Sequence, residues 1–237
     1  MSGRAIRGIL FDKDGTLFDF RATWDGWAAR VVSELGRGDA GTEARIARAI
    51  HFDRKTGRFL PSSPVIAGTN REAAELVAGA LLQADVAAVE RRLAALAAEA
   101  DLRETVPLRP LLGSLREGGL KLGVMTNDTE AVARAHTGAA GVAALFELIL
   151  GFDSGHGAKP APGPLLAFAR HCGLAPEACA MVGDSAHDLH AARAAGMVPV
   201  AVLTGVAEAA ELAPLAAAVL PDIGHLPEWL AGGQSRG

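Results

Sequence analysis

Cysteine, long apolar runs and excess charge are all scarce in this sequence, and each scarcity excludes a class of protein. The two cysteines, Cys172 and Cys179, form neither a Cys-x-x-Cys redox pair nor a zinc-binding pattern, so we expect them to be reduced packing residues. Charged residues interrupt the alanine-rich stretches before they reach the ~20 apolar residues of a membrane span. The net charge of −4 gives no electrostatic basis for binding nucleic acid.

The chain is long enough, and hydrophobic enough, to form a well-packed core. Its 237 residues, half of them hydrophobic, suffice for one large domain or for a domain with an appendage. The first residues, Met1 to Ile6, lack the apolar segment of a signal peptide. We therefore expect a cytoplasmic protein, a monomer or a homodimer, whose partner is neither a membrane nor a nucleic acid.

The most informative stretch runs from Ile9 to Asp19. Its short apolar start predicts a buried strand that places Asp12 at the carboxyl end and Asp14 on the following turn. Ligands bind at that end of the strands in an open α/β sheet. Gly15 allows the chain to turn there without a Cβ clash. By itself, an Asp-x-Asp-Gly segment more often only terminates a strand. A functional role for Asp12 and Asp14 therefore depends on the residues that follow the other predicted strands.

A long helical block follows this first strand. Apolar spacing predicts a helix over residues 24–35, a second helix capped by Thr42, a third capped by Asn70 and a fourth that begins at Asp85. No convincing strand interrupts the region from residue 20 to residue 101. This region therefore forms an all-helical unit.

The pattern changes at Pro107, where short strands begin to alternate with helices. The expected strands span residues 120–125, 146–152, 180–184 and 198–203. Strands separated by helices of this size indicate βαβ units and a parallel sheet. The predicted fold is α/β, with a doubly wound, Rossmann-like parallel sheet formed by residues 1–19 and 105–237 and an all-helical cap inserted over residues 20–104.

Polar residues follow the predicted strands of this sheet. Besides Asp12 and Asp14, the strand ends carry Thr126-Asn127, Lys159, Asp184 and, in the next helical turn, Asp188. The carboxyl ends of parallel strands share one edge, and carboxylates crowded there would repel one another unless a divalent cation joined them. Oxygen ligands with room for water and phosphate favour Mg²⁺.

The remaining groups at this edge suit phosphoryl transfer. Lys159, Thr126 and the backbone amides around Lys13 can donate to the oxygens of a phosphoryl group. Asp12 is then available as a nucleophile that forms an aspartyl-phosphate. Asp14 is placed to protonate the leaving oxygen and afterwards to activate water.

Four short motifs occur in order along the chain: Asp12-Lys13-Asp14-Gly15-Thr16, Met125-Thr126-Asn127, Lys159-Pro160 and Gly183-Asp184-Ser185-Ala186-His187-Asp188. In these motifs and their order the sequence resembles the haloacid dehalogenase superfamily, and specifically its phosphatases. The resemblance implies a phosphatase that uses Mg²⁺ to hydrolyse a small phosphorylated metabolite through a phospho-aspartate. The overall build is similar to the phosphoglycolate phosphatase group, which implies a small anionic substrate.

The resemblance also implies a role for each motif residue. Asp12 is the nucleophile, Asp14 the general acid and base, and Lys159 a catalytic residue that binds the phosphate and the intermediate. The implied phosphate-binding residues are Lys13, Thr126, Asn127 and Lys159. The implied Mg²⁺ ligands are Asp12, Asp14 through its backbone carbonyl, Asp184 and Asp188, the last directly or through water. The helical insert resembles the cap that closes over the site and selects the substrate.

Three alternative functions remain open. A sugar phosphomutase of the same superfamily would share the chemistry but transfer the phosphate to a sugar instead of to water. A catalytically silent phospho-ligand binding protein could use the same fold, although binding alone would not need Asp14. A signalling receiver also gathers acidic residues around a phosphorylated aspartate, but it carries no large insertion after the first strand.

Several other side chains have both a functional and an ordinary interpretation. Lys55 could contact substrate or lie in a solvated basic loop. His156 and His187 stand near motif residues, where local hydrogen bonding is the commoner role. Trp24 and Trp27 either line the substrate entrance or form the interior of the cap.

Overall fold

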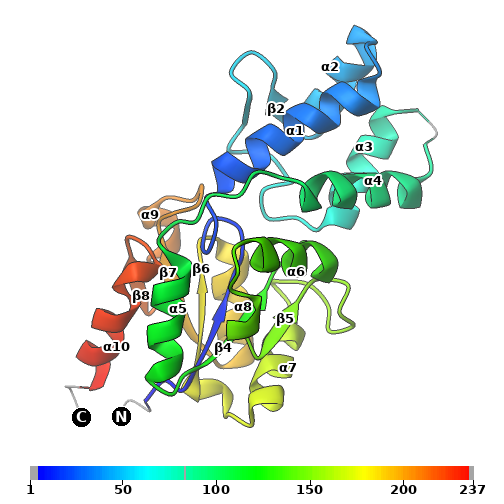
Figure 1. Ribbon diagram of the computed structural model, residues 1–237. Coiled ribbons are helices and arrows are strands. Elements are labelled where there is room, and N and C mark those ends of the chain that lie inside the picture. The colour runs from blue at the N-terminus through cyan, green and yellow to red at the C-terminus, as the bar shows by residue number, and fades with distance from the viewer. Residues whose placement is uncertain (1–4, 83, 235–237) are drawn as a thin grey trace.

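A six-stranded parallel sheet forms the centre of the computed structural model, which describes residues 5–82 and 84–234. The strands lie in the order β5-β4-β1-β6-β7-β8 (Figure 1). Their bounds are β1 Gly8–Phe11, β4 Lys121–Met125, β5 Leu148–Leu150, β6 Cys179–Gly183, β7 Val198–Val202 and β8 Ala218–Leu220. The predicted Rossmann-like parallel sheet is confirmed. Only β8 has no counterpart in the sequence analysis, because its three residues do not stand out from the alanine-rich chain around them.

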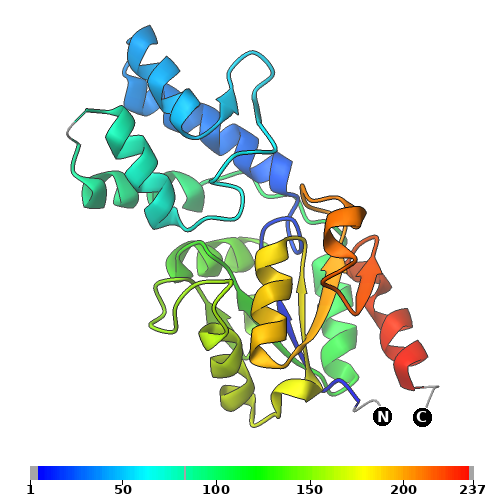
Figure 2. The same ribbon diagram turned by 180° about the vertical axis from the view of Figure 1, so that it is seen from behind.

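Helices cover both faces of the sheet. On one face, residues of α5 (Leu108–Glu117), α6 (Glu130–Ala139) and α10 (Leu226–Gln234) pack against the apolar side chains of the strands. The opposite face, seen in Figure 2, carries α7 (Gly163–Cys172), α8 (Ala186–Ala195) and the short α9 (Ala209–Leu212). Short 3₁₀ turns at Ala143–Leu145, Pro176–Ala178 and Ile223–His225 complete the connections.

The region between β1 and α5 forms a separate block above the carboxyl ends of the strands (Figure 1). It contains α1 (Phe20–Gly36), α2 (Ala40–Ala49), α3 (Asn70–Ala80) and α4 (Val86–Ala98). Buried residues of these four helices form an apolar cluster of their own, to which Val132 of α6 is added from the sheet side. We refer to residues 20–104 as the helical block.

The structure corrects three details within the helical block. The α2 helix is capped by Asp39, which accepts from the backbone amide of Thr42, the predicted cap. The α3 helix is capped by Thr69 in a reciprocal pair with Glu72, so that Asn70 is already helical. The block is also not wholly helical, because Phe52–Asp53 (β2) and Arg58–Phe59 (β3) pair as an antiparallel hairpin. A hairpin of two-residue strands is too short to show an alternating pattern.

The chain enters and leaves the helical block through two segments that run side by side. Phe18 and Glu104 form an isolated antiparallel bridge, and the backbone amide of Asp19 donates to the carbonyl of Arg103 at 2.8 Å. The Thr105 amide donates to the carbonyl of Leu17 at 3.0 Å. These hydrogen bonds pair the two segments by which the chain enters and leaves the block.

The structure also bears on two expectations from composition. Within the described ranges, no helix is long and apolar enough to cross a membrane. Both cysteines carry free thiols, and burial raises the pKa of the Cys179 thiol to about 11, as expected for a packing residue. Residues 1–4, part of the segment inspected for a signal peptide, lie outside the described residues.

Candidate active site

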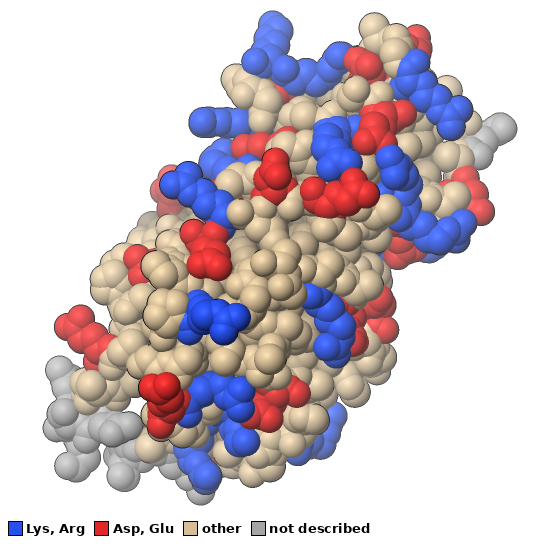
Figure 3. Space-filling model, in the orientation of Figure 1, with Lys and Arg blue, Asp and Glu red and all other residues tan. Residues whose placement is uncertain are grey.

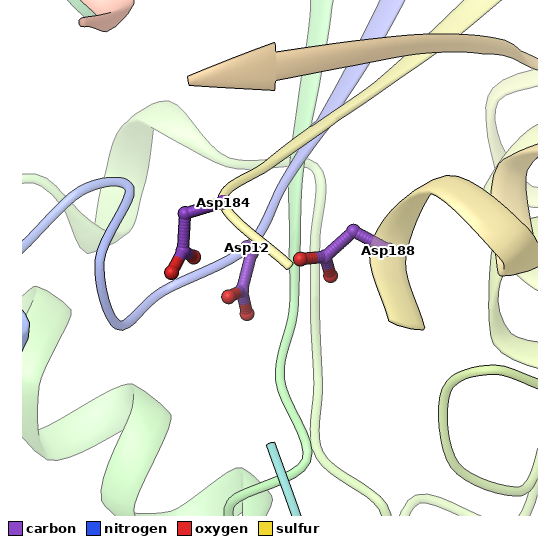
Figure 4. A group of neighbouring side chains, drawn as sticks. All are labelled: Asp12, Asp184 and Asp188. Atoms are coloured by element: carbon purple, nitrogen blue, oxygen red, sulfur yellow. The ribbon is translucent and has the colours of Figure 1, made fainter. Parts of the chain in front are cut away.

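Three buried aspartates meet at the carboxyl edge of the sheet. Asp12 directly follows β1, Asp184 follows β6, and Asp188 lies in the first turn of α8. One carboxylate oxygen from each lies within 4.8 Å of those of the other two. Figure 4 shows Asp12 between the other two carboxylates. The strand ends therefore bring together these three predicted site residues.

Lys159 places its ammonium group against this cluster. Its Nζ donates to Asp12 Oδ1 at 2.6 Å and to Asp188 Oδ1 at 2.7 Å. Burial lowers the Lys159 pKa, but the two carboxylates raise it more, so the lysine stays charged. Burial raises the pKa of Asp12 to about 7, with Asp188 and Asp14 adding to the effect and Lys159 opposing it.

The cluster fits a hard divalent cation. Three buried carboxylates face a single ammonium, and burial and the neighbouring Asp12 charge raise the pKa of Asp184 well above its ordinary value. All the available donors are oxygens, the ligand type that Mg²⁺ and Ca²⁺ prefer. A second cation would relieve the excess negative charge without any change in the fold.

We expect Mg²⁺ to stabilise the protein more at pH 8 than at pH 5.5. The folded-state pKa of Asp12 is raised from 3.8 to about 7, so the unfolding free energy of the metal-free protein falls as pH rises through this window. Mg²⁺ must compete with that proton at the lower pH. At about 100 times its Kd, Mg²⁺ should raise Tm by roughly 5–10 °C at pH 8. Equal shifts in thermal unfolding at both pH values would contradict binding of the cation at Asp12.

The loop after β1 is packed tightly against Asp184. Gly15 has a φ of +77°, and a Cβ at this position would collide with the Asp184 carboxylate, which confirms the need for glycine. Thr16 Oγ1 donates to Asp184 Oδ1 at 3.3 Å. On the other side, a Cβ at Gly205 would also collide with Asp184, and Thr204 Oγ1 donates to the Gly15 carbonyl at 2.5 Å. No sequence signal pointed to the Thr204-Gly205 loop.

Lys13 lies between Asp14 and a second layer of polar side chains. Its fully buried Nζ donates to Asp14 Oδ1 at 2.8 Å and lies 3.5 Å from Asp128 Oδ2. Burial lowers the Lys13 pKa, but Asp14 and Asp128 raise it more. Its side chain does not line the cavity described below. The predicted phosphate-binding role of Lys13 stays a prediction, while its ammonium is observed to hold Asp14.

His136 continues this network to the helical block. Its Nδ1 lies 3.0 Å from Lys13 Nζ, and its Nε2 lies 2.8 Å from the carbonyl oxygen of Ala97 in α4. An ammonium group can only donate and a carbonyl can only accept, so the neutral ring carries its proton on Nε2. Burial and the Lys13 charge lower the pKa of His136 to about 4, which keeps the ring neutral. Sequence analysis did not single out His136 or Asp128.

Replacement of Lys13 by methionine should destabilise the protein by about 3–5 kcal/mol, because it leaves the partly buried Asp14 and the buried Asp128 carboxylates without their cation. The control is Lys121→Met, which removes a half-exposed lysine paired with Glu147 and should cost about 1 kcal/mol or less. Urea unfolding measures both. Equal losses in the two variants would show that the buried network contributes nothing.

Thr126 and Asn127 follow β4 and occupy different positions. Thr126 Oγ1 accepts from the Asp128 amide at 3.1 Å, which leaves its hydroxyl proton free for a ligand. The Asn127 side chain donates to the carbonyls of Ala67 and Lys159 and accepts from the Lys159 amide. Its amide group thus fixes Lys159 to the strand end and to the helical block.

A cavity lies between the sheet edge and the helical block. From the sheet side it is lined by Asp12, Asp14, Thr126, Asn127, Asp128, Lys159, Asp184, Ser185 and His187. From the helical block it is lined by Phe20, Trp24, Trp27, Phe59, the segment 65–70 and Ala73. Both tryptophans line the cavity and also pack with the block's apolar cluster, so their two interpretations are compatible. Lys55 and His156 do not line it.

The acidic cavity thus lies at the carboxyl edge of a Rossmann-like parallel sheet, where ligands bind in sheets of this class, and the helical block lines its other side. The chain belongs to the haloacid dehalogenase-like hydrolases, whose family model matches residues 6–196.

Individual relatives extend this assignment. The phosphoglycolate phosphatase of Rhodospirillum rubrum is 39% identical over 128 residues, which cover 54% of this chain and 53% of that protein. The match thus spans about half the length of this curated relative. Among solved structures, CbbY from Rhodobacter sphaeroides in complex with phosphate matches with a TM-score of 0.69 and 20% identity, covering 93% of this chain and 96% of that one. A family hydrolase from Deinococcus radiodurans R1 with bound phosphate and sodium has a TM-score of 0.64 and 24% identity, covering 98% and 97%.

Proposed function

We propose that this protein hydrolyses a small phosphate monoester, with Asp12 as the nucleophile. The observation that carries the proposal is the position of Asp12. Asp12 directly follows the central strand β1. Its carboxylate contacts the Lys159 ammonium at 2.6 Å and lines the same cavity as Asp14. A nucleophile, an acid and a phosphate-binding cation are thereby available to one ligand.

The first half of the reaction transfers the phosphoryl group to Asp12. A carboxylate oxygen of Asp12 attacks phosphorus, and the bond from phosphorus to the ester oxygen breaks. Asp14 gives its proton to the departing alcohol. Lys159 and the free hydroxyl proton of Thr126 donate to the phosphoryl oxygens as charge develops on them.

The second half regenerates the carboxylate. Asp14, now ionised, accepts a proton from a water molecule whose oxygen attacks phosphorus. The bond from phosphorus to Asp12 breaks and phosphate leaves. Asp14 is thus protonated again and ready for the next ester. The buried Lys13 ammonium holds the Asp14 carboxylate in place through both steps.

Mg²⁺ is the cation we propose for this site. Asp12, Asp184 and the backbone carbonyl of Asp14 would hold it, and Asp188 would assist directly or through water. When bound, it neutralises negative charge on the phosphoryl group and on the aspartates. Asp188 has a further role, because its carboxylate accepts from Ser185 and from Lys159 and so joins the start of α8 to the lysine.

We also propose a division into two domains at the paired segments near residues 19 and 104. Residues 20–104 would act as a cap that moves about these segments and excludes water when closed. Two contacts across the interface support a closed arrangement: Asn127 with the Ala67 carbonyl, and His136 with the Ala97 carbonyl.

Phosphate release from a panel of monoesters tests the proposed activity. The panel includes benzyl phosphate, 2-phosphoglycolate, a sugar phosphate and a nucleotide, each with Mg²⁺ or with EDTA. We expect release that requires Mg²⁺ and that favours one ester. No release from any ester would refute the phosphatase assignment. Turnover that appears only with sugar phosphates and yields an isomer instead of phosphate would identify a mutase.

A further inference from the structure

The helical block gives the cavity an apolar wall. Trp24 and Trp27 pack edge to face with ring centroids 5.1 Å apart, and Phe20 lies 6.3 Å from Phe59. Val65 and Ile66 extend the same wall. Apart from the unpaired indole N–H of Trp24, the wall offers a ligand mainly aromatic faces and aliphatic side chains.

The polar side chains on this wall are engaged within the protein. The Thr69 hydroxyl donates to the carboxylate of Glu72 and accepts from the backbone amide of Glu72. The Asn70 amide donates to the carbonyl of Glu90 at 3.2 Å. These groups cap and brace α3, so they are poorly placed to bind a charged substrate.

The helical block adds no basic side chain to the cavity lining among the described residues, although the buried Lys13 ammonium of the sheet side lies 5.2 Å from the centre of the Trp24 ring. Among the described residues, no arginine or lysine of the helical block lines the cavity or the groove beside it. On the face shown in Figure 3, basic side chains lie over the outside of the block. The groove instead carries Glu72 and Glu75, together with His187. The cation that lines both hollows is Lys159, which is already bound to Asp12 and Asp188.

This distribution of charge determines which alcohol group of a phosphate ester the cavity binds favourably. Lys159 and a bound cation can compensate the phosphoryl group. A carboxylate on the alcohol would instead face apolar rings and the carboxylates of Asp14 and Asp128, which already share the buried Lys13 ammonium. Burying such a charge without a partner is strongly unfavourable. An aromatic or branched aliphatic alcohol would bury its apolar surface against the same rings and bind favourably.

We propose that the substrate is the phosphate monoester of an uncharged, mainly apolar alcohol, and that the site selects against carboxylated alcohols such as glycolate. The reaction itself rests on the proposed function above. The binding preference does not, because it depends only on the wall of the cavity and can be measured without turnover.

Two phosphonates that cannot be hydrolysed test the binding preference. Both 2-phenylethylphosphonate and 3-phosphonopropionate carry the same phosphonate and spacer, but one ends in a phenyl ring and the other in a carboxylate. Calorimetric titration in the presence of Mg²⁺ should show at least tenfold tighter binding of the phenyl compound. Equal affinity, tighter binding of the carboxylate, or binding of neither compound would overturn the inference.

A cation added to the wall should reverse the preference. Ile66 is half-buried and lines both the cavity and the groove, so Ile66→Arg should lower the affinity ratio of the two phosphonates at least tenfold. The matched control, Leu82→Arg, places the same charge on the exposed surface of the helical block and should leave the ratio unchanged. An unchanged ratio in Ile66→Arg, or an equal change in both variants, would contradict a role for the wall.

Turnover separates this inference from the proposed function. The kcat/KM for benzyl phosphate should exceed that for 2-phosphoglycolate at least tenfold. The phosphatase proposal fails, and the preference stands, when the two phosphonates bind unequally but neither ester is hydrolysed. The preference fails, and the phosphatase proposal stands, when 2-phosphoglycolate is hydrolysed at least as well as benzyl phosphate.

Discussion

Asp12→Asn should reduce kcat by at least about 10³-fold on every ester, because it removes the nucleophile from an otherwise intact site. The side chain keeps its volume, and the asparagine oxygen can still accept from Lys159. Replacing a buried carboxyl whose pKa is raised to about 7 also removes a charge that burial disfavours, so the folded state should not be weakened at neutral pH.

Phosphate release and thermal unfolding check both parts of this expectation. Asp101→Asn is the control, since Asp101 is exposed and lies outside the cavity. It should keep full activity. Asp12→Asn protein that is folded and retains substantial Mg²⁺-dependent turnover would refute the nucleophile assignment.

Asp14→Asn should distinguish esters by their leaving groups. For benzyl phosphate, whose alkoxide needs a proton in order to leave, we expect kcat/KM to fall by about 10²–10⁴-fold. For 4-nitrophenyl phosphate the loss should be much smaller, because nitrophenolate leaves without a proton. Dephosphorylation of Asp12 still needs a base, so nitrophenolate should appear as a burst followed by slow turnover.

The control for Asp14→Asn is Asp128→Asn. Asp128 also faces Lys13 and lines the cavity, but we assign no proton transfer to it. Its replacement should therefore affect both esters to the same extent. Equal losses on the two esters in Asp14→Asn, measured by initial rates, would contradict its role as the acid.

The sheet and its acidic edge are largely readable from the sequence. The run from Ile9 to Phe11 is apolar at consecutive positions because β1 lies at the centre of the sheet, and Asp12 follows where pairing to β4 and β6 ends. Helix boundaries within the helical block are less readable. Asp39 and Thr42 are both good caps, as are Thr69 and Asn70, and only hydrogen bonds in the folded chain select Asp39 and Thr69.

The side-chain partners around Asp14 could not be read from local patterns. Lys13 and His136 are separated by 123 positions and meet only because α6 packs beside the strand ends. The predicted role of Asn127 beside the phosphate remains a proposal, while its amide is observed to brace Lys159 and Ala67. Neither connection leaves a periodic signal in the chain.

The sequence by itself determined the parallel sheet, the inserted block and the gathering of Asp12, Asp14, Lys159, Asp184 and Asp188 at one edge. It could do so because strand ends in a parallel sheet share an edge whatever the details of packing. Only the tertiary structure decided which face of the helical block meets that edge. That face is apolar and carries no cation among the described residues, because the orientation of the block is set by contacts between residues far apart in the chain.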